Sequence, residues 1–205
     1  MDLQSTPRAN RLHIGFYGRR NAGKSSLINL VTGQQTALVS DHAGTTTDPV
    51  IKSMELLPLG PVAVIDTAGL DDEGDLGKLR ISRTMEMMDR TDLALLIVSA
   101  PDAGDTSLER GWLEELKKRK MPVIGVLNQI DRVGSDCVEN IRSGLEEDMG
   151  IPFTAVSANG REYRAELLSA IVKHAPTDFE SPTLVGDIFS RGDAVVLVAP
   201  QDIQA

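Results

Sequence analysis

Apolar residues along this chain form short continuous runs that alternate with stretches in which apolar residues recur every three or four positions. The run at 93–98 (Leu-Ala-Leu-Leu-Ile-Val) is typical of a strand that helices cover on both faces. Strands are predicted at residues 12–17, 50–57, 62–66, 93–99, 122–128 and 153–157. Their alternation with helices predicts an α/β fold with a mostly parallel six-stranded sheet.

Three later helices are predicted from apolar stripes that would face the core, on both faces of the sheet. The stripes are Leu108, Trp112 and Leu116 in the first, Val138, Ile141, Leu145 and Met149 in the second, and Leu167, Leu168, Ile171 and Val172 in the third. Between the second and third strands, residues 58–61 (Pro-Leu-Gly-Pro) predict a hairpin turn. One edge strand should therefore be antiparallel.

The first predicted strand leads into the sequence GxxxxGKS at residues 18–25. Its glycines let backbone N–H groups turn toward a phosphate chain, and the following helix directs its positive end to the same place. Lys24 offers a charge to the β- and γ-phosphates and Ser25 a hydroxyl to Mg²⁺. The strand before and the helix after distinguish a P-loop from an incidental glycine-rich turn. The expected nucleotide-binding residues here are Asn21, Ala22, Gly23, Lys24, Ser25 and Ser26.

Two further segments would complete a phosphate and Mg²⁺ site. Residues 66–69 (Asp-Thr-Ala-Gly) form a DxxG sequence at the end of a predicted strand. There Asp66 would hold Mg²⁺ through water, and the Gly69 N–H would reach the γ-phosphate. The segment 44–48 (Gly-Thr-Thr-Thr-Asp) would bring one threonine to Mg²⁺, the alternative being an ordinary polar loop.

A base-recognition site is predicted at residues 128–131 (Asn-Gln-Ile-Asp), which correspond to the NKxD sequence of GTPases. Asp131 can accept hydrogen bonds from guanine N1–H and the exocyclic amine, a donor pair that adenine lacks. Gln129 replaces the usual lysine and loses its length and charge, so we expect weaker affinity with guanine preference preserved. Residues 157–159 (Ser157, Ala158, Asn159) match the short loop whose alanine N–H reaches guanine O6.

Composition narrows the functions further. The 205 residues carry a net charge of −9 and 3% aromatic residues, which disfavours a broad nucleic-acid-binding surface. The basic run at 117–120 lies at a helix C-terminus, where it complements the helix dipole or forms a patch for RNA or a partner.

The single Cys137 excludes an internal disulfide and a self-contained cysteine metal site, and predicts a reduced thiol in a cytoplasmic protein. No apolar run approaches ~18 residues, so no membrane span is expected.

In this order the segments resemble a translation-factor-class GTPase, which implies a P-loop NTPase fold with a Ras-like G domain. Asn21, together with the segment 44–48, is similar to the TrmE–Era–EngA branch. That resemblance implies that Thr46, two residues after the glycine, completes the Mg²⁺ shell. It also implies that Asn21 helps to hold a K⁺ ion near the phosphates, the alternative being a plain turn residue.

A more specific resemblance is to the HydF family of FeFe-hydrogenase maturation GTPases. It rests on residues 45–50 (Thr-Thr-Thr-Asp-Pro-Val) and 69–74 (Gly-Leu-Asp-Asp-Glu-Gly), with further similarity at 11–15, 39–41, 52–58 and 66–68. The resemblance implies an N-terminal tail at 1–10, a GTPase domain at 11–175, and a linker with the start of a dimerisation domain at 176–205. It implies a GTP-driven switch, no iron–sulfur cluster in this chain, and as partners a second copy, the hydrogenase and other maturases.

The sequence does not identify which residue would orient the attacking water. Leu70 stands where other GTPases carry glutamine, and leucine cannot hydrogen-bond water, so turnover should be slow. Glu73 is the nearest candidate acid; Asp71, Asp72 and Asp75 compete, and a solvated acidic loop is the favoured alternative. Two other functions stay open: an RNA-assembly or tRNA-modification GTPase of the same branch, and a nucleotide-gated dimerisation module with negligible hydrolysis.

Overall fold

The computed structural model describes residues 11–33, 50–66 and 85–176, and the account that follows concerns these ranges. The described strands are β1 (Leu12–Tyr17), β2 (Val50–Leu56), β3 (Gly60–Asp66), β4 (Leu93–Ser99), β5 (Val123–Asn128) and β6 (Phe153–Ala155). The helices are α1 (Lys24–Thr32), α3 (Ser107–Lys118), α4 (Ser135–Met149) and α5 (Tyr163–His174), with short 3₁₀ turns η2 (Ala100–Asp102) and η3 (Ile130–Arg132).

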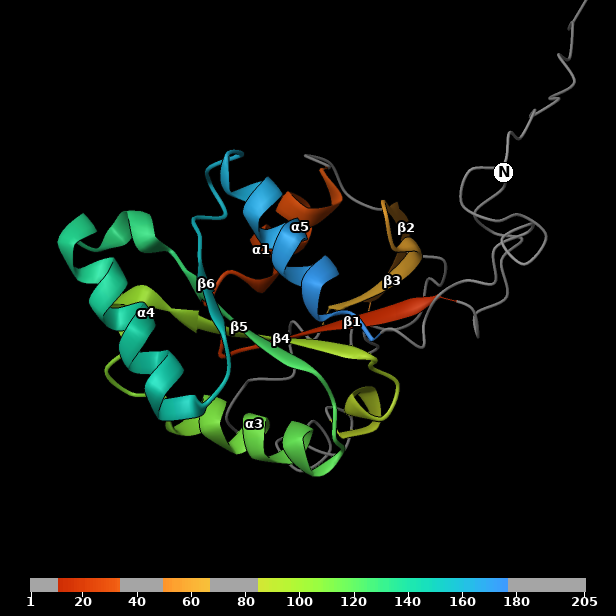
Figure 1. The fold of residues 1–205 in the computed structure, drawn as a ribbon, viewed down its shortest axis with the longest axis horizontal. Helices are drawn as coiled ribbons and strands as arrows, with labels where there is room; N and C mark the ends of the chain where they lie inside the picture. The colour runs from red at the N-terminus through yellow and green to blue at the C-terminus, as the bar shows by residue number, and fades with distance from the viewer. Residues whose placement is uncertain (1–10, 34–49, 67–84, 177–205) are drawn as a thin grey trace, which may run out of the picture.

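The six strands form a single sheet in the order β2-β3-β1-β4-β5-β6 (Figure 1). Every neighbouring pair is parallel except β2 and β3, which run antiparallel at one edge with Met54 opposite Val62. The predicted α/β class, the mostly parallel six-stranded sheet and its antiparallel edge strand are therefore confirmed. This architecture agrees with the P-loop NTPase fold that the sequence resemblance implied.

Strand ends differ from the prediction at the two edges of the sheet. The hairpin is tighter than the proline positions suggested, because Leu56 already pairs with Gly60. At the other edge β6 ends at Ala155, not at residue 157, because it has only β5 to pair with. The Val156 N–H still donates to the Leu127 carbonyl at 2.8 Å, after which the chain leaves the sheet.

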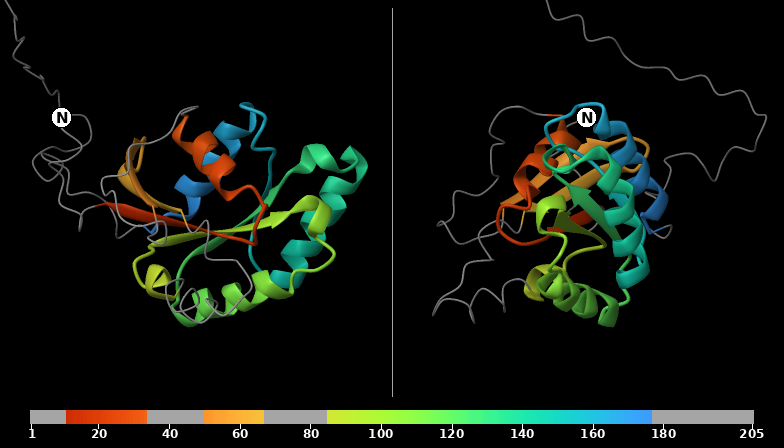
Figure 2. Two further views of the ribbon diagram at one scale, coloured as in Figure 1. Left: turned by 180° about the vertical axis from the view of Figure 1, so that it is seen from behind. Right: turned by 90° about the vertical axis from the view of Figure 1, so that its left-hand side faces the viewer.

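Helices cover both faces of the sheet, with α1 and α5 on one side and α3 and α4 on the other (Figures 1 and 2). Strand β4 shows how one sequence serves both layers. Its Leu95 and Ile97 pack in the core with α1 and α5, whereas Leu96 and Val98 pack in the core with α3 and α4. Alternate side chains of a strand point to opposite faces, which is why the whole run 93–98 had to be apolar.

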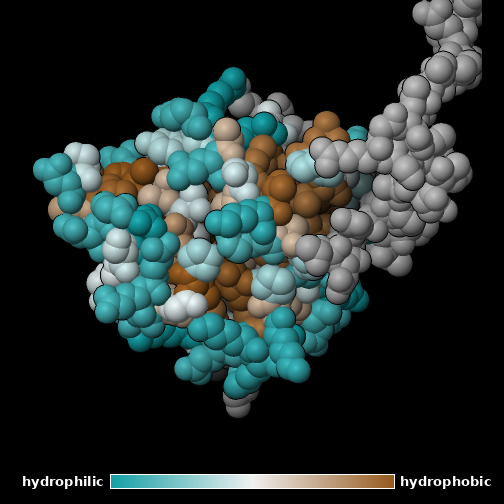
Figure 3. Space-filling view, in the orientation of Figure 1, coloured by the Kyte–Doolittle hydropathy of each residue, from teal (hydrophilic) through white to brown (hydrophobic). Residues whose placement is uncertain are grey.

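The predicted stripe of α3 is wrong at one position. Leu108 is 45% exposed and Trp112 only partly buried, whereas Leu113 and Leu116 are buried together with Glu109. The buried face is thus rotated by about one residue from the apolar pattern, and the outer surface over α3 is hydrophilic (Figure 3). The α4 stripe does face the core, most deeply at Leu145 and Met149. So does the α5 stripe at Leu167, Leu168 and Ile171, whereas Val172 is only partly buried and lies outside both core clusters. Among the helices of the described ranges, none has the length and apolar character to cross a membrane.

Candidate nucleotide-binding site

The predicted P-loop connects β1 to α1 and closes around its own lysine. Lys24 is 5% exposed, and its Nζ donates to the carbonyls of Gly18 and Arg19, the latter at 3.0 Å. Asn21 and Gly23 both have left-handed backbone conformations, with φ of 64° and 90°. A cradle of this kind directs successive backbone N–H groups to one point, which suits an anion.

Space requires glycine at both Gly18 and Gly23, and the left-handed backbone conformation requires it at Gly23 as well. A Cβ at Gly23 would lie 2.3 Å from the Asn128 side-chain nitrogen, and one at Gly18 would lie 2.5 Å from the Ile97 carbonyl oxygen. Both contacts are shorter than any real Cβ tolerates. The glycines therefore let the loop lie directly against the ends of β4 and β5.

Asn128, at the end of β5, joins the P-loop to the loop after β6. Its Nδ2 donates to the Ala22 carbonyl at 2.8 Å, and its Oδ1 accepts from the Ala158 N–H at 3.1 Å. The side chain is 1% exposed, so these bonds are shielded from water. One buried amide thus unites three segments that were predicted separately.

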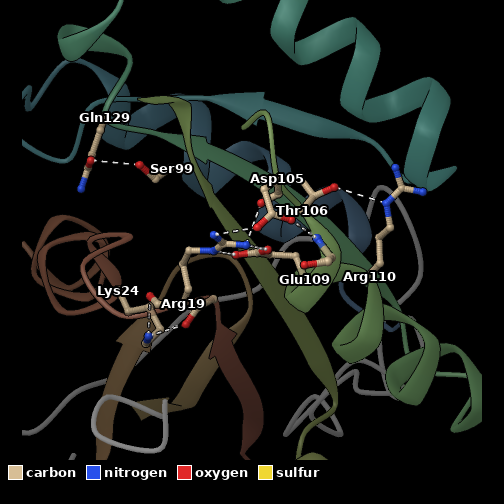
Figure 4. A network of polar contacts seen from close by, with 10 residues as sticks. Arg19, Lys24, Ser99, Asp105, Thr106, Glu109, Arg110 and Gln129 are labelled. Atoms are coloured by element: carbon tan, nitrogen blue, oxygen red, sulfur yellow. Dashed lines mark hydrogen bonds and ion pairs between the residues drawn. The ribbon is translucent and has the colours of Figure 1, made fainter. Parts of the chain in front are cut away.

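Gln129 makes a second connection to the P-loop. Its Nε2 donates to the Asn21 carbonyl at 2.7 Å, while its Oε1 accepts from Ser99 Oγ at 3.2 Å and Arg132 Nη1 at 2.8 Å (Figure 4 shows Ser99 and Gln129). A neutral amide can brace the loop because two donors orient it. Ser99 and Arg132 were not anticipated, since nothing local in the sequence pairs them with Gln129.

Asp131 is held as an ionised acceptor at the outer end of the site. Its Oδ1 accepts from Ser157 Oγ at 2.6 Å and its Oδ2 from Asn159 Nδ2 at 3.3 Å. The hydrogen bond from Ser157 is the main cause that lowers the pKa of Asp131 below its ordinary 3.8. The carboxylate is exposed, and a charged acceptor pair is the group that two neighbouring N–H donors of a base require.

The residues expected to hold Mg²⁺ are only partly within the described ranges. Ser25 lies in the first turn of α1, as does the nucleotide-binding candidate Ser26. Asp66 ends β3, where its backbone pairs in register with Phe16, one residue before the end of β1. A hydroxyl and a carboxylate are residue types that suit Mg²⁺, which prefers oxygen ligands. Within the described part of the chain, no group of three His, Cys, Asp or Glu side chains could hold a metal by itself. Several predicted residues lie outside the described ranges: Thr46, Gly69, Leu70, Glu73 and the acids Asp71, Asp72 and Asp75. So do residues 177–205 of the linker and domain start predicted at 176–205.

The basic run at 117–120 is mostly engaged within the fold. Lys117 Nζ donates to the Met149 carbonyl at 2.8 Å, Lys118 pairs with Glu115, and Arg119 pairs with Asp89 and Glu115. These contacts favour the structural role of the run over a patch for nucleic acid.

One contact of the site was missed altogether. Arg19, the second residue of the P-loop, forms a forked ion pair with Glu109 of α3 (Figure 4). Within the sequence of α3, this ion pair is indicated only by an acidic residue on the buried side of an amphipathic helix. The arginine that pairs with it lies ninety residues earlier in the sequence.

Comparisons with known proteins agree with this geometry. A family model described as 50S ribosome-binding GTPase matches residues 13–129. The tRNA modification GTPase MnmE of Chromobacterium violaceum is 37% identical over 165 residues, which cover 78% of this chain and 35% of that protein. The same-named protein of Coxiella burnetii is 40% identical over 120 residues, or 57% of this chain and 26% of that one. The chain thus spans about a third of the first relative and about a quarter of the second.

Solved structures show the same fold. A variant of Era from Aquifex aeolicus bound to GDP·AlF4⁻ superimposes with a TM-score of 0.67 at 24% identity, covering 80% of this chain and 56% of that one. The G domain of the T. maritima FeoB iron transporter superimposes with a TM-score of 0.58 at 24% identity, covering 80% of this chain and 98% of that domain. At these identities the likeness establishes the fold alone.

Proposed function

Since this chain belongs to the family described as 50S ribosome-binding GTPase, and so is a GTP-binding GTPase domain, we propose that it hydrolyses GTP slowly, with Mg²⁺, as a molecular switch. The observation that carries the proposal is the position of Asn128. Its amide, in the same segment 128–131 as Asp131, ties the phosphate loop to the loop at Ala158 through hydrogen bonds. A nucleotide laid along these segments would have its base at Asp131 and its phosphates at Lys24.

The phosphate end supplies charge and position for the reaction. Ser25 and Thr46, with Asp66 through water, would hold Mg²⁺, which neutralises charge on the β- and γ-phosphates. Lys24 and the N-terminus of α1 would bind the same phosphates. The Gly69 N–H would sense the γ-phosphate, and Glu73 is the proposed acid beside the attacking water. Binding would order the loops that carry Thr46 and Gly69, and hydrolysis would release them.

Phosphate release tests the proposal directly. The chain should release phosphate from GTP but not from ATP, and chelation of Mg²⁺ by EDTA should stop the reaction. Nucleotide binding with phosphate release at background would instead favour the nucleotide-gated dimerisation module. Light scattering with GTP and GDP would then show whether the oligomeric state follows the nucleotide.

For the cellular process, we propose tRNA modification ahead of hydrogenase maturation. The support is that relatives 34–37% identical to this chain carry the name tRNA modification GTPase. The net charge of −9 and the internally paired basic run argue against RNA contact by this domain itself. In this proposal the domain acts as the switch, and any contact with tRNA belongs to other parts of the protein.

Hydrogenase maturation remains a second candidate because of one specific observation. The segments 45–50 and 69–74 resemble the HydF family more closely than they resemble general GTPase patterns. The comparisons do not support this assignment. In the second candidate, the partners are another copy of the chain, the hydrogenase and other maturases, and the cluster lies outside residues 1–205.

Deletion of the gene separates the two processes. Modified nucleosides in total tRNA would be measured by mass spectrometry, and hydrogenase activity would be measured in the same cells. Loss of a modified nucleoside with hydrogenase intact would support tRNA modification. Loss of hydrogenase activity with unchanged tRNA would support cofactor maturation.

A further inference from the structure

The guanidinium of Arg19 extends away from the P-loop and forms hydrogen bonds with Glu109 in α3 and with Asp105 just before α3. Its Nε donates to Glu109 Oε1 at 2.7 Å and its Nη2 to Glu109 Oε2 at 2.8 Å. The same Nη2 also donates to the Asp105 carbonyl at 2.7 Å (Figure 4). This is the forked arrangement that fixes both the distance and the orientation of an arginine.

Burial makes this pair difficult to open. Glu109 is 1% exposed and lies on the face of α3 that also buries Leu113 and Leu116. A carboxylate in such surroundings is costly unless it is paired and hydrogen-bonded. The hydrogen bond to Glu109 is in turn the main cause that raises the pKa of Arg19. Each charge therefore holds the other in place.

The backbone of Arg19 is itself part of the phosphate cradle. Its carbonyl accepts from Lys24 Nζ at 3.0 Å and from the Ala22 N–H at 3.2 Å. A shift of Arg19 would move the carbonyl that locates the phosphate-binding lysine. The side chain of Arg19 thus anchors the same residue whose main chain positions Lys24.

We propose that Glu109, acting through Arg19, is a positioning residue of the P-loop and that this clamp slows the release of bound guanine nucleotide. The inference rests on the proposed GTP binding and assigns α3 a part in it. It also assigns Arg19 a role in orientation, since its guanidinium faces α3.

The test compares nucleotide release from matched variants of the 205-residue chain. Release of GDP and GTP that carry a fluorescent methylanthraniloyl group would be followed by stopped flow, and Tm would be measured for each variant. Glu109→Gln should speed release of both nucleotides by about tenfold, the factor that ~1.4 kcal/mol of lost positioning produces. Arg19→Lys keeps the charge but loses the fork, so its release should be accelerated to a smaller extent.

Asp148→Asn, on the neighbouring helix α4, is the matched control. It breaks the ion pair between α4 and Arg110, the residue next to Glu109, without contact with the P-loop. It should release nucleotide at the wild-type rate. If it accelerates release as much as Glu109→Gln does, the effect is a general loosening of α3 and the clamp is overturned.

A double-mutant cycle separates the clamp from a direct phosphate contact of Arg19. If Arg19 acts only through Glu109, the pair Arg19→Gln and Glu109→Gln together should accelerate release no more than Arg19→Gln alone. Additive effects would overturn the clamp, because they would require Arg19 to act elsewhere.

The remaining outcomes are also decisive. If Glu109→Gln does not fold, Arg19→Lys decides, and wild-type release from that variant would overturn the inference. If the wild-type protein binds nucleotide and Glu109→Gln releases it at the wild-type rate, this inference is overturned while the proposed function stands. Wild-type protein that binds no nucleotide would overturn the proposed function and the inference with it.

Discussion

The side-chain amide of Gln129 donates a 2.7 Å hydrogen bond to the main-chain carbonyl of Asn21, and so ties the end of β5 to the P-loop. The position is one where similar GTPases carry lysine. The neutral amide keeps the brace to the loop because Ser99 and Arg132 occupy its oxygen and leave its nitrogen facing Asn21. The loss of charge at this position is thus accompanied by a local network that orients the replacement.

Replacement of Gln129 by alanine should weaken GTP binding about fivefold. The variant loses one hydrogen bond to the P-loop, worth ~1 kcal/mol, and leaves the base contacts intact. Calorimetric titration with GTP and ATP would measure both affinity and selectivity, and selectivity should not change. A variant that binds GTP as tightly as wild type would show that the brace contributes nothing to binding.

Asp131→Asn should change the base preference of the site from guanine to xanthine. GTP affinity should fall by at least tenfold, because two charge-assisted hydrogen bonds of ~1.5–3 kcal/mol each are lost or inverted. Xanthosine triphosphate should bind better than it does to wild type, since its extra carbonyl accepts from an amide. Titration with both nucleotides checks the prediction, and unchanged GTP affinity would remove Asp131 from the base site.

The same carboxylate predicts a pH dependence. The Ser157 hydroxyl lowers the pKa of Asp131, so the ionised acceptor persists to lower pH than an ordinary aspartate would allow. GTP affinity should therefore be level at neutral pH and fall only as pH drops below about 4, where aspartate protonates. In Ser157→Ala the pKa of Asp131 should rise, and the fall should begin at higher pH. Coincident titration curves for the two proteins would contradict this account.

Gly23→Ala should abolish nucleotide binding and destabilise the fold. The new Cβ would enter the space of the Asn128 amide, at a residue whose φ is 90°, and strain of this type costs ~1–3 kcal/mol. Gly144→Ala is the matched control, because it lies within α4 and its Cβ would have no neighbour within 4 Å. The control should be more stable by ~0.5–1 kcal/mol in thermal unfolding. Equal behaviour of the two variants would refute the steric argument.

The proposed K⁺ ligand can be tested without disturbing the backbone. Phosphate release should be faster in KCl than in NaCl at equal ionic strength if a cation beside Asn21 assists the reaction. Asn21→Gly keeps the left-handed conformation and the carbonyl that Gln129 binds, but removes the side chain. It should equalise the two salts. Equal rates already in the wild type would remove the K⁺ proposal and leave Mg²⁺ as the cation required.

Local chemistry determined much of this protein before any contact was known. Strands β1 and β4 begin and end at the predicted residues, and the run 93–98 is apolar because β4 is buried on both faces. The short turn at 58–61 was enough to predict the antiparallel edge strand. Each nucleotide-binding segment was recognised from residues only a few positions apart in the sequence. Thr46, Gly69 and Glu73 stay predictions, since they lie outside the described residues.

Only the tertiary structure decided how distant charges and amides meet. The apolar pattern of α3 pointed to Leu108, yet the helix buries Glu109, because Arg19 in the P-loop neutralises it. Asn128 likewise bridges Ala22 and Ala158, and Ser157 tunes Asp131, across gaps that no local period encodes. The spacing of apolar residues along a segment predicts which face it can bury against an apolar neighbour. Which polar group finds its partner depends on how the segments pack.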